Sequence, residues 1–261
     1  MRLVTWNINS LRLPLPLLQR LVQEEQPDVI CLQEIKVQDS EFPEAALKAL
    51  GYPHILRHGM KGYNGVAILS RREFLAKDPQ NWCAKNDSRH GRVILSGDLD
   101  LQNFYIPAGG DIPDPKKNEK FAHKLKFLDE MTAYFQNRRS KKKSIMVGDL
   151  NIAPLEHDVW SHKQLLDVVS HTPIEVEKLA SIKKAGKWVD AVRHFVPADQ
   201  KLFSWWSYRS PDWTKNDRGR RLDHIWVTPD LEKDLKQARI RKDMRAWQQP
   251  SDHVAVVLDF K

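Results

Sequence analysis

Short apolar segments recur along the whole chain, and they constrain the fold more tightly than any other feature of the sequence. Several are apolar at every position, which is typical of strands covered on both faces. We expect strands over residues 3–8, 29–33, 66–70, 93–99, 103–106, 144–148, 222–227 and 254–260. Two packed sheets with helices outside would accommodate that number of strands.

Helical patterns fall between these strands. Residues 15–25 begin between two prolines, Pro14 and Pro16, and residues 42–50 are followed by Gly51, a residue type favoured at helix C-caps. Residues 121–139 carry a helical apolar stripe, whereas residues 155–187 have mixed signals and receive no assignment. Because strands and helices mix throughout, without a repeat or a linker, the sequence predicts one α/β or α+β domain over residues 1–261.

Composition and charge exclude several classes of protein. The chain has 261 residues, with 42 Lys or Arg against 34 Asp or Glu, so its net charge is +8. A hydrophobic fraction of 41% with nine Trp excludes a disordered tail, and the length suffices for a buried core. The positive charge is compatible with a polyanionic partner and equally with a solvated basic surface.

The cysteine content and the hydropathy of the chain indicate where in the cell the protein is expected. Two cysteines, Cys31 and Cys83, argue against a disulfide scaffold, and Cys31 lies in an apolar run where a buried thiol is expected. No apolar stretch approaches the length of a membrane span, and the N-terminus lacks a signal-peptide layout. We therefore expect a soluble, cytoplasmic protein that does not bind membranes.

Acidic and amide residues stand where five of the apolar segments begin or end. They are Asn7 and Asn9, Glu34, Asp149 and Asn151, Asp223, and Asp252 with His253. Each alone is most simply a turn residue or a structural pair. If the five strand ends converge on one rim, however, their side chains form a site.

Such a convergence has chemical consequences. Carboxylates buried together repel one another unless something positive lies among them. Oxygen ligands suit a hard cation, Mg²⁺ or Mn²⁺, and zinc is disfavoured because no Cys/His cluster has ligand spacing. Cleavage of a phosphate ester needs a metal for the developing charge, a carboxylate to orient water, and donors for the phosphate oxygens. The pattern therefore favours metal-dependent phosphoester cleavage.

Six segments, in order along the chain, resemble the motifs of the exonuclease III family. They are WNINSLR (6–12), PDVICLQEIK (27–36), GYNGVA (62–67), GDLNIAP (148–154), RLDHI (221–225) and PSDH (250–253). WVDAVRH (188–194) and FSWWSYR (203–209) are also family-like. The family comprises DNA-repair nucleases with apurinic/apyrimidinic (AP) endonuclease activity. The resemblance implies a four-layer α/β sandwich of the DNase I-like kind, with two mixed sheets and an active site at one edge.

The resemblance also implies a metal site and a catalytic group. Glu34 would be the principal ligand of Mg²⁺, with Mn²⁺ as a substitute. The metal and its waters would be held by Asn7, Asn9, Glu34, Asp149, Asn151, Asp252 and His253. The catalytic residues would be Tyr105 at the scissile phosphate, Asp149 orienting or deprotonating water, Asn151 fixing Asp149 and the phosphate, and His253, held by Asp223, as donor to a phosphate oxygen.

The implied substrate is duplex DNA with abasic sites or 3′ ends, bound by a monomer. The duplex would be cleaved 5′ to the abasic site, leaving a 3′-OH, with 3′–5′ exonuclease and 3′-phosphodiesterase activity besides. Lys36 and Tyr63 would grip phosphates, so binding would weaken steeply with salt. Trp205 and Leu222 would line the pocket for the extruded sugar, with Arg220 beside them.

Three departures from the family pattern leave the balance of activities open. Arg220 stands where relatives often carry Trp or Leu against the sugar, and it could stack, bind the phosphate or narrow the pocket. Ala108 stands where relatives have Asn or Gln. The loop 109–115 is acidic where some relatives insert a basic residue into the duplex.

Two rival interpretations remain. A phosphoesterase for inositol phosphates, sphingolipid or general DNA would share the same acids and His253. Segments 62–66 and 203–209 and the positive charge favour the DNA-repair branch instead. A DNA-binding scaffold with a retired site is disfavoured because every expected catalytic residue type is present.

Overall fold

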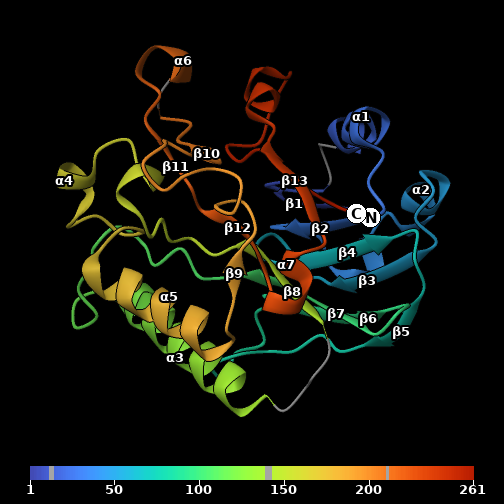
Figure 1. The fold of residues 1–261 in the computed structure, drawn as a ribbon, viewed down its shortest axis with the longest axis horizontal. Coiled ribbons are helices and arrows are strands. Elements are labelled where there is room, and N and C mark those ends of the chain that lie inside the picture. Colours follow the sequence, from blue (N-terminus) through green and yellow to red (C-terminus); the bar gives the residue numbers. More distant parts are fainter. Residues whose placement is uncertain (12–14, 139–142, 210–211) are drawn as a thin grey trace.

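Two six-stranded sheets pack face to face in the computed structural model, which describes residues 1–11, 15–138, 143–209 and 212–261 (Figure 1). The first sheet has the order β13 (Leu235–Ile240), β14 (Val256–Phe260), β1 (Arg2–Asn7), β2 (Val29–Gln33), β4 (Val66–Ser70) and β3 (His54–His58). The second has the order β5 (Phe74–Lys77), β6 (His90–Leu95), β7 (Leu99–Tyr105), β8 (Ser144–Asp149), β12 (Asp223–Val227) and β9 (Val189–Asp190). Both sheets are mixed, because β1–β2 and β7–β8 are parallel among antiparallel neighbours.

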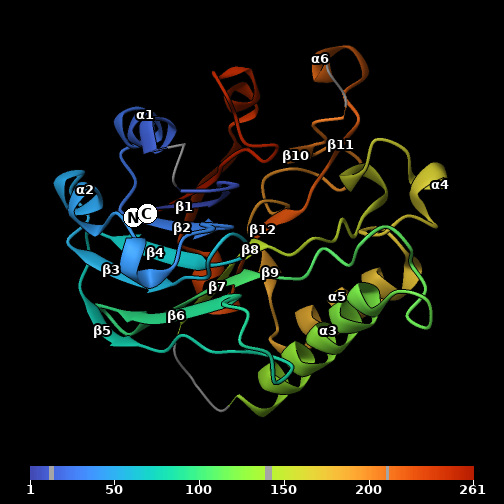
Figure 2. The same ribbon diagram turned by 180° about the vertical axis from the view of Figure 1, so that it is seen from behind.

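Helices cover the outer faces of both sheets, which completes four layers. The helices α1 (Leu15–Glu25) and α2 (Glu44–Ala49) cover the first sheet, and α3 (Glu119–Asn137) and α5 (Pro173–Ala185) lie side by side on the second (Figures 1 and 2). The connections hold the short helices α4 (His162–Leu165), α6 (Trp213–Asn216) and α7 (Pro229–Glu232) and the two-stranded sheet of β10 (Trp205–Trp206) and β11 (Gly219–Arg220). This is the expected four-layer α/β sandwich.

The central strands are apolar at successive positions because both of their faces are buried. On β8, Ile145 and Val147 face the layer between the sheets, whereas Met146 packs against α3 and α5. On β1, Leu3 faces the inter-sheet layer and Val4 faces α1. Full burial of such a side chain contributes about 1.5–3 kcal/mol, so these strands anchor the rim where they end.

Several sequence expectations differ from the structure. The strand expected over residues 93–99 is wrong, because the chain turns there and Leu95 pairs with Leu99 across a β6–β7 hairpin. Gly97 and Asp98 have φ of 86° and 58°, so the left-handed backbone of the turn breaks the apolar run. The unassigned stretch contains α5, whose first turn is closed by Glu175 accepting from the Thr172 hydroxyl (2.6 Å).

The helix expected over residues 121–139 begins earlier, at Glu119. The side chain of Asn118 caps it by accepting from the Lys120 amide at 3.0 Å. The helix ends at Asn137, and the expected end at Arg139 lies outside the described residues. The helix expected over residues 42–50 spans only Glu44–Ala49.

Gly148 allows β7 and β8 to approach closely just before the acid that ends β8. Its φ is +141°, and a Cβ at this position would lie 1.8 Å from the carbonyl oxygen of Phe104. No side chain larger than hydrogen fits there, so the glycine fixes where the following Asp149 emerges.

The structure also bears on the expectations about membrane-spanning segments and about the two cysteines. No helix among the described residues is long and apolar enough to cross a membrane. Cys31 and Cys83 are both buried free thiols, and burial raises the pKa of each above its usual value. Neither has the lowered pKa of a reactive cysteine.

Candidate active site

Strand ends from both sheets meet at one edge of the molecule. In the first sheet, β1 ends at Asn7, and Glu34 directly follows β2. In the second, Asp149 at the end of β8 is in register with Tyr105 on β7 and with Asp223 on β12. The predicted convergence of polar strand ends is therefore present in the structure.

A single amide joins the carboxylates of the two sheets. Nδ2 of the buried Asn7 donates to Oε1 of Glu34 and to Oδ2 of Asp149, at 2.9 Å each. The Tyr105 hydroxyl donates to the same Oε1 atom at 2.7 Å. These neutral donors hold two acids close together and leave the Oε2 edge of Glu34 for a cation.

Asp149 is buried, and both of its carboxylate oxygens accept hydrogen bonds from Asn151. Its Oδ1 accepts from the backbone N–H of Asn151 at 3.0 Å, and its Oδ2 accepts from Nδ2 of the Asn151 side chain at 3.1 Å. The carbonyl of Asn151 in turn accepts from Nζ of the buried Lys124 at 2.8 Å. Burial raises the pKa of Asp149, and the charge of Asp223 adds to this rise, while His253 opposes it. The carboxylate is thus a stronger base than an ordinary aspartate.

His253 lies between two carboxylates. Its Nδ1 is 2.8 Å from Oδ2 of Asp223, and its Nε2 is 3.7 Å from Oδ2 of Asp149. The Ser204 hydroxyl donates to the same Asp223 oxygen at 2.6 Å and so fixes that acid. Burial alone would lower the pKa of His253, but the charges of Asp223 and Asp149 outweigh it and raise this pKa. The imidazole is therefore held as a cationic donor.

Two groups of side chains at the rim could receive a metal ion. Asp149, Asp223 and His253 bring ligand atoms within 4.8 Å of one another. However, Nδ1 of His253 is already engaged, because it lies 2.8 Å from Oδ2 of Asp223. That group is better described as an Asp–His pair with a base beside it.

The second group lies around Glu34. Its Oε2 is 2.8 Å from Nζ of Lys36, and the same ammonium donates to Oδ1 of Asn9. Two oxygens thus already converge on a positive charge. Burial raises the pKa of Glu34, but the charge of Lys36 and hydrogen bonds from Asn7 and Tyr105 outweigh it and lower this pKa. An ionised carboxylate beside amide oxygens fits a hard divalent cation.

Four residues of this rim have a left-handed backbone. Asn9, Glu34, Lys36 and Asn151 have φ between 51° and 55°. Such a conformation costs on the order of 1 kcal/mol or more for a residue with a Cβ, and it tends to occur at functional sites. The chain therefore accepts strain in order to aim these side chains.

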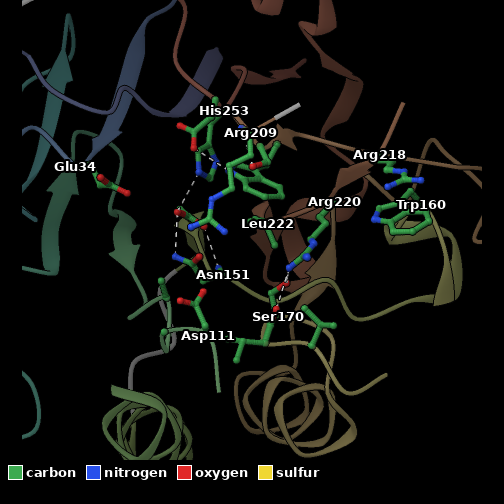
Figure 3. A pocket seen from close by; sticks show the side chains of 18 of the residues that line it. Glu34, Asp111, Asn151, Trp160, Ser170, Arg209, Arg218, Arg220, Leu222 and His253 are labelled. Atoms are coloured by element: carbon green, nitrogen blue, oxygen red, sulfur yellow. Dashed lines mark hydrogen bonds and ion pairs between the residues drawn. The ribbon is translucent and has the colours of Figure 1, made fainter. Parts of the chain in front are cut away.

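The acids open into a solvent-accessible cavity of about 840 Å³ (Figure 3). Glu34 lies at one end of it and Trp160 with Arg218 at the other, with His253 between them. Asp252 lines the wall, and its Oδ2 accepts from the Trp205 indole at 2.9 Å.

The residues that the sequence predicts to bind DNA lie in three different places. Trp205, Leu222 and Arg220 lie together in this cavity. Lys36 is beside Glu34 as an ion-pair partner. Tyr63 is 59% exposed and lies in a separate cavity of about 760 Å³, on the other side of Tyr105.

Sequence reasoning missed several residues that shape the site. Ser204 orients Asp223, Lys124 supports Asn151, and Arg209 and Arg218 line the cavity. Arg209 belongs to the family-like segment 203–209, which marked the region without giving it a role. Nothing in the local sequence separates an arginine that faces a cavity from one on an open surface.

An acid-rich rim that opens into a cavity on a four-layer sandwich suits the hydrolysis of phosphate esters. The chain matches the Endonuclease/Exonuclease/phosphatase family over residues 4–253, and it belongs to this family. The exonuclease III resemblance is therefore confirmed, and the chain is a hydrolase.

Comparison with individual relatives shows to which nucleases within this family the chain is similar. The chain is 32% identical to exodeoxyribonuclease III of Haemophilus influenzae, covering 100% of both chains. It is 30% identical to an exodeoxyribonuclease of Bacillus subtilis, covering 99% of this chain and 98% of that one. An AP endonuclease from Archaeoglobus fulgidus and a Neisseria 3′ phosphatase bound to product DNA hairpin each superpose with a TM-score of 0.92 at 30% identity, covering 100% of this chain and 99% of theirs. The chain is thus a DNA-repair nuclease of the exonuclease III and AP endonuclease type.

Proposed function

We propose that the chain is a Mg²⁺-dependent phosphodiesterase that cleaves duplex DNA 5′ to abasic sites and leaves a 3′-OH. It also shortens or unblocks 3′ ends. The observation that carries this proposal is the cationic His253 placed 3.7 Å from the basic Asp149 in an open cavity, with Glu34 nearby. The site draws on both sheets of a single chain, which supports residues 1–261 acting as one domain that works as a monomer.

Asp149 is the proton acceptor. Its raised pKa suits it to take a proton from water as the water oxygen attacks phosphorus. The two hydrogen bonds from Asn151 hold the carboxylate in one orientation during this step.

His253 is the donor to the phosphate. Its protonated ring, oriented by Asp223, donates to a non-bridging oxygen and stabilises the charge that grows there. Burial and the charges of Glu34 and Asp149 raise the pKa of Tyr105, so its phenol stays protonated and also acts as a donor. The new P–O bond to water forms as the P–O3′ bond breaks, and the departing 3′ oxygen takes a proton from solvent while Asp149 holds the proton of the attacking water.

The metal would be held by Glu34, with Asn7, Asn9 and Asp252 at the ion or its waters. Asp149, Asn151 and His253 would stand on the other side of the phosphate. When bound, a divalent ion supplies positive charge for the leaving oxygen. Mn²⁺ has the same ligand preference as Mg²⁺ and would substitute for it.

The DNA partner is inferred from the cavity walls and the relatives. Lys36 beside Glu34 and Tyr63 in the neighbouring cavity would contact phosphates, while Trp205 and Leu222 offer the apolar surface that an extruded sugar needs. The similar AP endonuclease and 3′ phosphatase support internal abasic sites and 3′ ends as the two kinds of substrate.

The test uses a duplex that carries a single abasic analogue. Incubation with Mg²⁺ should give one nick 5′ to the lesion, ending in a 3′-OH, and EDTA should abolish it. Undamaged duplex and an inositol phosphate serve as comparison substrates. Faster hydrolysis of the inositol phosphate, or DNA binding without cleavage, would contradict the proposal.

A further inference from the structure

Arg220 extends along the wall of the cavity and is fixed there. Its Nη1 donates to the carbonyl of Val169 at 2.9 Å and to the hydroxyl of Ser170 at 2.7 Å (Figure 3). Its guanidinium carbon lies 5.3 Å from the ring centroid of Trp205. A side chain held from three directions is a built part of the wall.

Among the residues that the structure describes, Arg220 has no ion pair of its own, and the carboxylate whose charge acts on it, that of Glu175, is ion-paired with Lys124. The next residue, Arg221, is ion-paired with Asp158 and Asp190, at 3.0 and 2.7 Å. Within the described residues, by contrast, Arg220 has no carboxylate within ion-pair distance, and its Nε is buried without a hydrogen-bond partner. The cavity wall therefore carries a fixed guanidinium whose positive charge has no ion-pair partner of its own in the described part of the chain.

Arg220 lies in the part of the cavity that would hold the group attached to the reacting phosphate. His253 and Asp149 mark where the reacting phosphorus would lie, and Arg220 lines the same cavity beside Leu222. The group placed in that part of the cavity would be the substituent that stays on the phosphorus through its 5′ oxygen when the 3′ oxygen departs. In an internal abasic site it is an uncharged sugar. In a 3′-terminal phosphate it is a further ionised oxygen.

We propose that Arg220 is a specificity-determining residue that makes this cavity favour 3′-terminal phosphate over an internal abasic sugar. The inference rests on the proposed function and ranks its two substrates. In the favoured reaction water attacks the terminal phosphorus and the P–O3′ bond breaks. The 3′ oxygen is protonated, and the products are inorganic phosphate and a 3′-OH end. A guanidinium that lies against a dianion contributes more than one that lies against a neutral sugar.

The test compares two duplexes of identical sequence, one with a 3′-phosphate at a nick and one with an internal abasic analogue. The readout is the ratio of kcat/KM for the first substrate to that for the second. The parent should favour the 3′-phosphate, and Arg220→Met should lower the ratio by about tenfold or more, which is the usual contribution of one charge-assisted hydrogen bond. Arg220→Lys should keep most of the ratio, because it keeps the charge.

Arg218 provides a matched control. It also lines the cavity, and its guanidinium carbon lies 4.6 Å from the ring centroid of Trp160. Arg218→Ala removes an equal charge farther out, so it should lower both rates together and leave the ratio unchanged. Arg220→Gln is a second neutral variant that can keep the bond to Ser170 if the Met variant does not fold, and it should behave like Met.

Two results would overturn the inference alone. One is a parent that cleaves the abasic duplex faster than the 3′-phosphate, and the other is a ratio that stays the same in both neutral variants. A parent that cleaves neither duplex in Mg²⁺ would instead overturn the proposed function and, with it, this inference.

Discussion

His253 and Asp223 form a buried pair in which Nδ1 lies 2.8 Å from Oδ2. The pair fixes the ring so that Nε2 faces Asp149, 3.7 Å away. One acid thus holds the proton on the imidazole while the other remains beside it as a base. These are the two charged states that the proposed mechanism requires.

Asp223→Asn should lower the pKa of His253. The imidazole loses its nearest negative charge, and burial alone favours the neutral ring. An NMR titration should find the ring protonated across neutral pH in the parent and neutral there in the variant. The alkaline limb of the pH–rate profile should move to lower pH. Asp243→Asn, which affects an acid paired with Arg241, should change neither, and a protonated ring at pH 7 in the Asp223 variant would contradict the account.

Asp149→Asn should abolish most turnover and spare DNA binding. The amide keeps the shape of the carboxylate but cannot accept the proton of water. We expect a loss of about 10²–10⁴-fold in the single-turnover rate, the usual contribution of a positioned base. Anisotropy with labelled abasic duplex should give a Kd within a few-fold of the parent's. A variant that cuts at the parental rate would refute the role of Asp149.

Lys124→Met should destabilise the protein. Its Nζ lies 2.5 Å from Oε1 of Glu175 and 2.8 Å from the Asn151 carbonyl, and both charged side chains are fully buried. Loss of the ammonium leaves an unpaired buried carboxylate, which costs about 3–5 kcal/mol. Urea unfolding measures this. Lys120→Met, on an exposed position of the same helix, should stay within about 0.5 kcal/mol of the parent, and equal effects would contradict the prediction.

The buried pair of Asp190 and Arg221 should make stability depend on acid pH. Burial would raise the pKa of Asp190, but the charge of Arg221 outweighs it and lowers this pKa below its usual value. A lowered folded-state pKa gives stability that is present above the unfolded-state pKa of about 3.9 and is lost as pH falls below it. The free energy of unfolding of the parent should therefore fall more steeply below about pH 5 than that of Asp190→Asn. Parallel curves in denaturant titrations would contradict this.

Much of the fold could be predicted from the sequence because it rests on local pattern. Strands buried on both faces are apolar at successive positions, as residues 145–147 are, and an acid at the end of such a run marks the rim. The β6–β7 hairpin was missed because apolar residues continue to its edges, and only Gly97 and Asp98 mark the turn.

The site was less predictable because its contacts join distant parts of the chain. The resemblance placed Asp149 and His253, which the structure brings together, and their roles remain predictions. The hydrogen bond of Ser204 to Asp223 spans 19 residues, and that of Lys124 to Asn151 spans 27. No periodicity or motif specifies such pairs, since they depend on how the sheets pack.

The most direct test of the central claim, that Asp149 and His253 act as one hydrolytic unit, is a double-mutant cycle on single-turnover nicking of abasic duplex. Groups that act in one step have strongly non-additive effects. Asp149→Asn combined with His253→Ala should be no slower than the slower single variant. If the two losses multiply, the residues act independently and the account of the site is wrong.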